Sequence, residues 1–267
     1  MFHLGKRHDE PEIVPEKLHE RIDYKIFIVI LAGLLFYQFY LYSFKSPNDP
    51  NIELVETTVT SVTALIASVI GFFVAKRYWN SRVFGTSYLA LALGMLMNVI
   101  AERVYYFLGH IGQTPSPSVA DIFWLAFYPL MFYHLARNIS FFKPKIRLPV
   151  KAFVIVLPIV ITGVYAFLGY NQEQAADTTF FLGLAYSIGG SVILSGAILG
   201  AIIFRQGILG VPWLVLAMGI ILTTAGDVWY SYVDLYNGYM ITHMLNLLWY
   251  AGYLVIAYAL YKHKKVI

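Results

Sequence analysis

Residues 85–108, GTSYLALALGMLMNVIAERVYYFL, decide the fold, because this run is long and apolar enough to cross a bilayer and yet contains Glu102. A transmembrane helix needs about 20 consecutive, mostly apolar residues. A carboxylate inside a bilayer is costly unless it faces protein or water. The run therefore predicts a membrane-spanning helix whose acid faces the interior of a helical bundle.

Further runs of similar length and composition occur along the whole chain. Hydrophobic residues make up 59% of its 267 positions and charged residues only 13%, whereas about a quarter of the residues in soluble domains are charged. We therefore predict an all-α integral membrane protein with eight transmembrane helices. The predicted helices are residues 24–44, 57–76, 85–108, 118–138, 149–169, 178–204, 211–232 and 239–261.

The second apolar run with an acid near its end, residues 211–232, repeats features of the first. LALG at 91–94 recurs as LAMG at 216–219, and WLAFY at 124–128 recurs as WYAGY at 249–253, at one constant offset without a gap. The paired acids and aromatic residues favour a duplication over a chance match. The same offset pairs Glu102 with Asp227, Tyr105 with Tyr230, Asp121 with Asn246, Trp124 with Trp249 and Tyr133 with Tyr258.

Four helices in each half bring both halves into the membrane from the same side, which predicts two parallel repeats, residues 24–142 and 143–262. Lys and Arg gather at one end of the predicted helices, and only Lys45 and Arg103 fall elsewhere. Because these residues accumulate on the cytoplasmic side, we predict a cell-membrane protein with two short cytoplasmic tails, residues 1–23 and 263–267. The formal charge of +4 then reflects topology and attraction to lipid head groups, and we expect membrane lipids as partners and no nucleic acid.

Several kinds of chemistry are excluded by composition. The chain has no cysteine, so disulfides, thiolate metal sites and cysteine nucleophiles are ruled out. No lysine lies in the middle of a predicted helix, which rules out a retinal Schiff base, and we expect no cofactor. His110 and His243 are expected to form hydrogen bonds at loop ends, because a zinc site built with His243 would match no recognised ligand spacing.

The predicted site lies between the repeats, near the outer ends of the helices. Each interior acid belongs to a polar stripe at helical spacing that continues to a tyrosine one turn further on. The helices that follow add further polar and aromatic residues at the same end. This arrangement favours a cationic or hydroxyl-rich ligand, bound by Glu102, Asp227, Asp121, Asn246, Tyr105, Tyr230, Trp124 and Trp249.

Structural alternatives remain open for some of these residues. SVAD at 118–121 is typical of a capping box, in which Asp121 satisfies backbone amides at the start of a helix. Arg103 either reaches the membrane interface or pairs with Asp121. Ser187, Ser191 and Ser195 recur every four residues beside Gly196 and Gly200, a pattern typical of close helix packing. A serine nucleophile is disfavoured, since no Gly-x-Ser-x-Gly elbow is present.

At 115–130, PSPSVADIFWLAFYPL, the chain resembles the multi-helix membrane input region that precedes GGDEF-type diguanylate cyclases and some histidine kinases in bacteria. GDVWY at 226–230 and LLWYAGY at 247–253 resemble the second-half counterpart in the same regions. The resemblance implies a sensory or ligand-binding role. Because no cyclase or kinase follows the last helix, it also implies a separate signalling partner. Nothing in the sequence indicates an oligomeric state.

The chain is also similar to the lysoplasmalogenase-like family of eight-helix membrane hydrolases. The similarity lies in GIILTTAGD at 219–227 and in the following helix with Trp249 and Tyr250. That similarity implies that Glu102 and Asp227 act as acid and base on an enol-ether or ester lipid. A membrane sensor or ligand-binding module is therefore the first prediction, and a lipid hydrolase is the second. A small-solute transporter that rocks about the repeat interface is the third.

Overall fold

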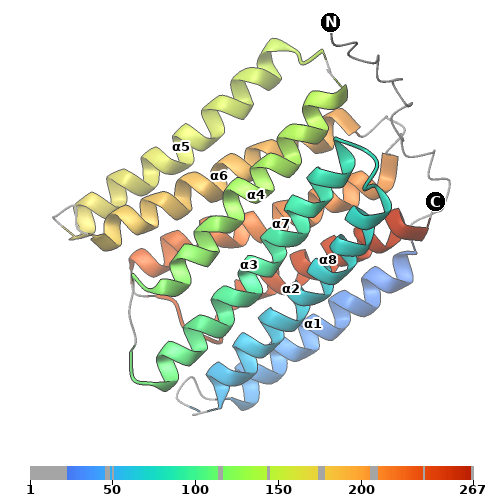
Figure 1. Ribbon diagram of the computed structural model, residues 1–267. Helices are drawn as coiled ribbons and strands as arrows, with labels where there is room; N and C mark the ends of the chain where they lie inside the picture. Colours follow the sequence, from blue (N-terminus) through green and yellow to red (C-terminus); the bar gives the residue numbers. More distant parts are fainter. Residues whose placement is uncertain are drawn as a thin grey trace, which may run out of the picture.

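The computed structural model describes residues 23–45, 49, 51–113, 117–142, 145–173, 178–204, 210–236 and 238–265 (Figure 1). Nearly all of the predicted amino-terminal tail lies outside these residues. The described chain is all α-helical and contains every predicted helix. The helices are α1 Tyr24–Phe44, α2 Ile52–Arg77, α3 Phe84–His110, α4 Val119–Phe142, α5 Leu148–Glu173, α6 Thr178–Phe204, α7 Gly210–Leu235 and α8 Asn246–Lys265.

Seven helices, α1 to α7, are long and apolar enough to cross a membrane by length and composition, as expected of a multi-pass membrane protein. The last helix, α8, is less apolar and ends in a lysine-rich stretch. Its packing explains why a less apolar sequence is accommodated there, because Tyr250, Ile256 and Leu260 are fully buried in the bundle. The structure also moves the start of this helix from residue 239 to Asn246 and extends its end to Lys265, into the predicted tail 263–267.

Local hydrogen bonds account for the later start of α8. The segment from 238 to 245 forms turns, in which the backbone N–H of Asn246 donates to the carbonyl of His243 and that of His243 donates to Met240. The Asn246 side chain also donates to the carbonyl of Ile241 at 2.8 Å. Hydropathy alone does not detect such turns, because the residues that form them are mostly apolar.

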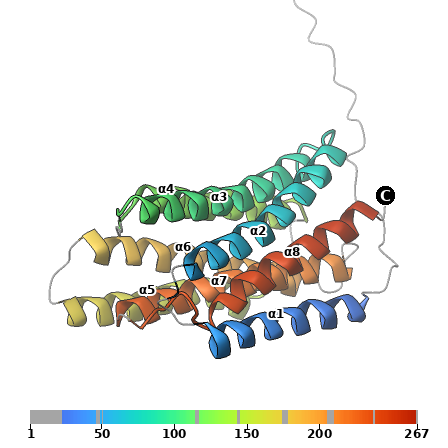
Figure 2. The same ribbon diagram turned by 90° about the horizontal axis from the view of Figure 1, so that it is seen from below.

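The helices pack in layers around a shared interior (Figure 2). α3 and α4 lie on one side of the bundle, α1 and α5 lie on the other, and the remaining helices lie between them. α2 contacts α3 and α8, while α6 contacts α7 and α4. α1 packs on α8, and α5 packs on α6 and α7. We call the end of the bundle that carries Lys76 and Lys151 the basic end, and the opposite end the acidic end.

α5 is the least buried of the seven helices α1 to α7, and hydrogen bonds help to fix it to the bundle. Pro158 within α5 has no N–H, so the carbonyl of Val154 one turn earlier loses its helical donor. The hydroxyl of Ser195 in α6 donates to that carbonyl at 2.6 Å. In a membrane, a neighbouring serine is one of the few groups that can satisfy a carbonyl freed by proline.

Ser195→Ala is therefore expected to lower the free energy of unfolding by about 1 kcal/mol, because a buried carbonyl loses its donor. The matched control is Ser187→Ala in the same helix. The Ser187 hydroxyl is buried and has no hydrogen-bond partner within the described part of the chain, so its removal should leave stability unchanged. Unfolding midpoints in mixed micelles titrated with SDS measure both. Equal losses in the two variants would contradict this role for Ser195.

Candidate functional site

Asp227 lies in α7 near the acidic end and is held by an aromatic side chain of α8. Its carboxylate accepts a hydrogen bond from the indole N–H of Trp249, with Oδ1 and Nε1 2.9 Å apart. Tyr230, one turn further along α7, packs on the same indole with ring centres 5.8 Å apart and planes at 49°. Gly226 permits this approach, since a Cβ there would lie 2.8 Å from Trp249 Nε1.

A matching arrangement joins α3 and α4. The indole of Trp124 in α4 lies beside the Glu102 carboxylate of α3 and interacts with it. Tyr105 packs on that indole with ring centres 5.6 Å apart and planes at 52°. Each helix pair therefore places an acid, an indole and a phenol together, and the indole and phenol rings pack in nearly the same geometry in both. The residues involved are those that the sequence pairs at one offset.

The two arrangements face a common interior region. Tyr253 of α8 interacts electrostatically with both Asp227 and Glu102. Tyr105 and Tyr230 interact with each other and with Asp121. Residues far apart in the sequence, on α3, α4, α7 and α8, are thus brought together toward the acidic end.

Asp121 caps α4 and also contacts α6. Its carboxylate accepts the backbone N–H of Ser118 at 2.6 Å, and the Ser118 hydroxyl accepts the N–H of Ala120 at 3.2 Å. These bonds confirm the capping interpretation. The other carboxylate oxygen accepts a hydrogen bond from the Tyr186 hydroxyl at 2.6 Å, so the cap residue also links α4 to α6.

The Arg103 side chain contacts α2, whereas an ion pair with Asp121 would require it to reach α4. Its Nε donates to the Ser61 hydroxyl at 2.9 Å and its guanidinium reaches Thr58 at 3.4 Å, both on α2. The proposed Arg103–Asp121 pair is therefore wrong. The rotation of α3 about its axis explains this, because it turns the guanidinium toward the hydroxyl-bearing face of α2 and away from the amino end of α4.

Asn246 anchors the turn before α8 instead of projecting freely. Its side chain accepts a hydrogen bond from Tyr239 at 3.2 Å and donates to the carbonyl of Ile241. Burial raises the pKa of Tyr239 well above its usual value, so the phenol stays neutral and remains a donor. The His243 ring accepts the N–H of Leu245 at 3.1 Å, which matches the role expected of it at a loop end.

Glu56 is a buried acid that the sequence prediction did not include in the site. It is only 2% exposed and accepts hydrogen bonds from Tyr37 of α1, at 3.4 Å, and from Tyr250 of α8. The Asn246 side chain also interacts with it. The predicted helix began at residue 57, which left Glu56 outside it. Helical spacing with Thr60 and Thr63, both buried, was the available signal.

A second buried polar cluster, also outside the prediction, lies nearer the basic end. The Ser87 hydroxyl lies 2.9 Å from Nδ1 of His134, and the amide of Asn138 donates to the same hydroxyl. All three side chains are fully buried, and the His134 ring stacks on Trp213. Hydrogen bonds of this kind hold transmembrane helices together, so the cluster joins α3 to α4.

The acids of the site are held by aromatic donors. Indole or phenol groups donate to Glu56, Asp121 and Asp227, and an indole lies beside Glu102. Within the described residues, the ion pair formed is Lys45 with Asp49, outside this cluster. No three His, Asp or Glu side chains in the described part of the chain are placed to share a metal ion. The site therefore combines buried carboxyl groups with aromatic faces.

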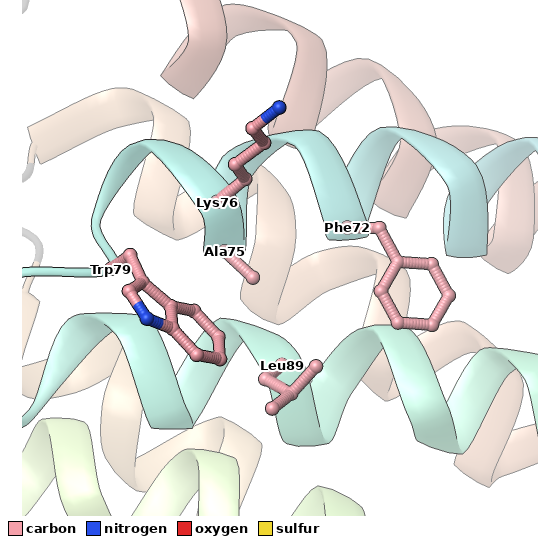
Figure 3. Close-up of a pocket in the computed structure, with 5 residues that line it drawn as sticks. All are labelled: Phe72, Ala75, Lys76, Trp79 and Leu89. Carbon is pink, nitrogen blue, oxygen red and sulfur yellow. The ribbon is translucent and has the colours of Figure 1, made fainter.

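Two surface grooves lie away from this cluster. One, of about 430 Å³ between α2 and α3, is lined by Phe72, Ala75, Lys76, Trp79 and Leu89 at the basic end (Figure 3). In Figure 3 the Lys76 ammonium points away from the rings of Trp79 and Phe72, which flank Leu89. The other groove, of about 330 Å³, lies between α4, α5 and α6.

The fold and this cluster define a multi-pass α-helical membrane protein with an acidic, aromatic-lined interior. Comparisons with protein-family models, curated proteins and solved structures found no match. The resemblances to sensory input regions and to lysoplasmalogenase-like hydrolases therefore stay predictions based on their motifs.

Proposed function

We propose that the protein is a sensor or ligand-binding module of the cell membrane, with its site between two parallel four-helix repeats near the outer leaflet. Both termini are cytoplasmic, and output passes through a separate partner protein. The observation that carries this proposal is the duplicated acid, indole and phenol arrangement, formed once by Glu102, Trp124 and Tyr105 and again by Asp227, Trp249 and Tyr230.

The helix contacts support the two repeats. α2 packs on α3 and α3 on α4, as α6 packs on α7 and α7 on α8. The contact of α2 with α8 has its counterpart in the contact of α6 with α4. An approximate two-fold axis along the membrane normal would produce this pattern. α1 and α5 fall outside it, since α1 packs on α8 whereas α5 packs on α6 and α7.

The chemistry of the cluster favours a small organic cation as ligand. Carboxylates in a low-polarity interior are costly unless a cation or a proton compensates them. The faces of tyrosine and tryptophan attract cations, most strongly when water is excluded. A site that combines acids with Trp124, Trp249, Tyr105 and Tyr230 offers both contributions, and binding sites of this kind are mostly apolar with a few converging polar groups.

A hydrolase is the second candidate. Acid–base catalysis needs two groups whose environments separate their roles. Tyr253 interacts electrostatically with both acids, whereas Arg103 interacts with Glu102 and the Trp249 indole donates to Asp227. The shared interaction with Tyr253 supports the binding of one ligand by both acids, and turnover of a lysolipid distinguishes the two functions.

Native mass spectrometry of protein released from nanodiscs tests the proposal. We expect a small-molecule adduct on the wild type that is lost in both Glu102→Gln and Asp227→Asn. The matched control is Asp49→Asn, which makes the same charge change at the acidic end but outside the cluster. Identical nonspecific lipid on all samples would mean that the acids are structural and would end the shared-site proposal. Turnover of an added enol-ether lysolipid, abolished in both acid variants, would favour the hydrolase instead.

A further inference from the structure

The groove between α4, α5 and α6 has a shape that follows from how these helices pack. α4 and α5 lie on either side of α6, and each contacts α6 (Figures 1 and 2). Small side chains of α6, Ser195 and Gly196, line the groove, while Phe132 and Ile139 of α4 and Leu199 of α6 add apolar surface. An apolar space of about 330 Å³ therefore opens between these helices.

The groove lies in the half of the bundle nearer the basic end. It is lined by residues 132–140 near the end of α4, 154–158 near the start of α5 and 192–199 near the end of α6. Arg147 and Lys151 share the helical face of Val154 and Pro158 by their spacing of three and four residues. Lys151 is about 4.5 Å along the axis from Val154, at 1.5 Å per residue, so its side chain can extend over the end of the groove.

These two cations are available to a ligand. Both side chains are exposed. Within the described residues, neither forms an ion pair, since the pair found there joins Lys45 and Asp49 at the opposite end. Ser140, also exposed, lines the groove on the α4 side. The groove thus presents an apolar channel that ends in positive charge and a hydroxyl group.

We propose that this groove binds one anionic glycerophospholipid, with an acyl chain between α4 and α5 and the phosphate head group at Arg147 and Lys151. A basic pocket beside transmembrane helices is the arrangement expected for an anionic head group. A neutral lipid would fill the apolar part without using the two cations, whereas an anionic lipid satisfies both parts. This inference is independent of the ligand site at the acidic end.

The test uses the full chain in nanodiscs of phosphatidylcholine with added phosphatidylglycerol, and native mass spectrometry counts the retained lipids. Wild type is expected to retain phosphatidylglycerol in preference to phosphatidylcholine. Arg147→Gln with Lys151→Gln should lower that preference by about thirtyfold. Ala136→Leu and Ser140→Leu, made separately, each fill the groove and keep Arg147 and Lys151. Each should lower the total amount of lipid that the protein retains. The charge control, Lys25→Gln with Lys76→Gln, removes two cations from the basic end on other helices and should change nothing.

Each outcome decides the question. Equal retention of the two lipids by wild type, or equal loss in the charge control, would overturn the proposal in favour of general attraction at the membrane surface. A dimer that dissociates in Ala136→Leu, without a lipid adduct, would assign the groove to a second copy of the chain. Unchanged unfolding midpoints in phosphatidylcholine alone would show that the variants fold. If Ala136→Leu does not fold, Ser140→Leu fills the groove at an exposed position and gives the same test.

Discussion

Gly219→Ala is expected to lower the free energy of unfolding by about 2–3 kcal/mol, because α7 and α8 cross at this residue with almost no space between their backbones. A Cβ at Gly219 would lie 2.7 Å from Ile256 Cγ1, 2.9 Å from the Ile256 backbone nitrogen and 3.0 Å from the carbonyl oxygen of Gly252. Two of these atoms belong to backbone, which cannot move without separating the helices. SDS unfolding in mixed micelles, followed by tryptophan fluorescence, measures the loss.

Gly94→Ala is the matched control, since the constant sequence offset pairs Gly94 with Gly219. A Cβ there would lie 3.4 Å from Phe127 Cδ2 and 3.6 Å from Leu130 Cβ, which is ordinary van der Waals contact. Alanine also has a higher helix propensity than glycine, by about 1 kcal/mol. We therefore expect Gly94→Ala to be neutral or slightly stabilising. Equal destabilisation by the two substitutions would show that the close approach of α7 and α8 is not what makes Gly219 necessary.

Glu56→Ala is expected to cost about 2–3 kcal/mol of stability, through the hydrogen bonds that it removes from α1 and α8. The Glu56 carboxylate is the acceptor for Tyr250, which is fully buried, and for Tyr37 of α1. Without it, polar groups in the bundle interior lose their partner, and each unsatisfied group costs about 1–3 kcal/mol. SDS unfolding measures the loss. Because α1 packs on α8, hydrogen exchange should also rise selectively in α1.

Glu56→Gln separates hydrogen bonding from charge. Glutamine keeps a carbonyl oxygen and nearly the same volume, so the Tyr250 hydroxyl retains an acceptor. We expect this variant to lose less than about 1 kcal/mol. A neutral result for Glu56→Ala, with unchanged exchange in α1, would mean that Glu56 is not what joins α1 and α8 to α2.

Helix existence was largely predictable, whereas helix ends were not. The long apolar runs predicted all the helices, because length and hydropathy alone identify segments that a bilayer can accept. The start of α8 was misplaced, since the Asn246 side chain and the His243 turn lie within apolar sequence. The start of α2 was also misplaced, and with it Glu56, because an acid near the end of an apolar run resembles a loop residue in hydropathy.

Partners of the candidate residues were harder to predict than their positions. The constant offset paired Glu102 with Asp227 and Trp124 with Trp249, and the structure places Trp124 beside Glu102 and Trp249 beside Asp227. The capping box of Asp121 was also predictable, because it depends on residues only three positions apart. The contacts of Arg103 with α2 could not be predicted, because no pattern in a single sequence shows which neighbouring helix a side chain faces.

Composition and apolar runs were by themselves enough to indicate a multi-pass helical membrane protein, and the internal offset paired Glu102 with Asp227. These are local or one-dimensional properties, readable from the order of residues along the chain. Tertiary structure alone decided that Arg103 reaches Ser61, that Glu56 is buried against Tyr250 and that a groove opens between α4 and α5. Each of these depends on the rotation and spacing of helices relative to one another, which the packing of the whole bundle determines.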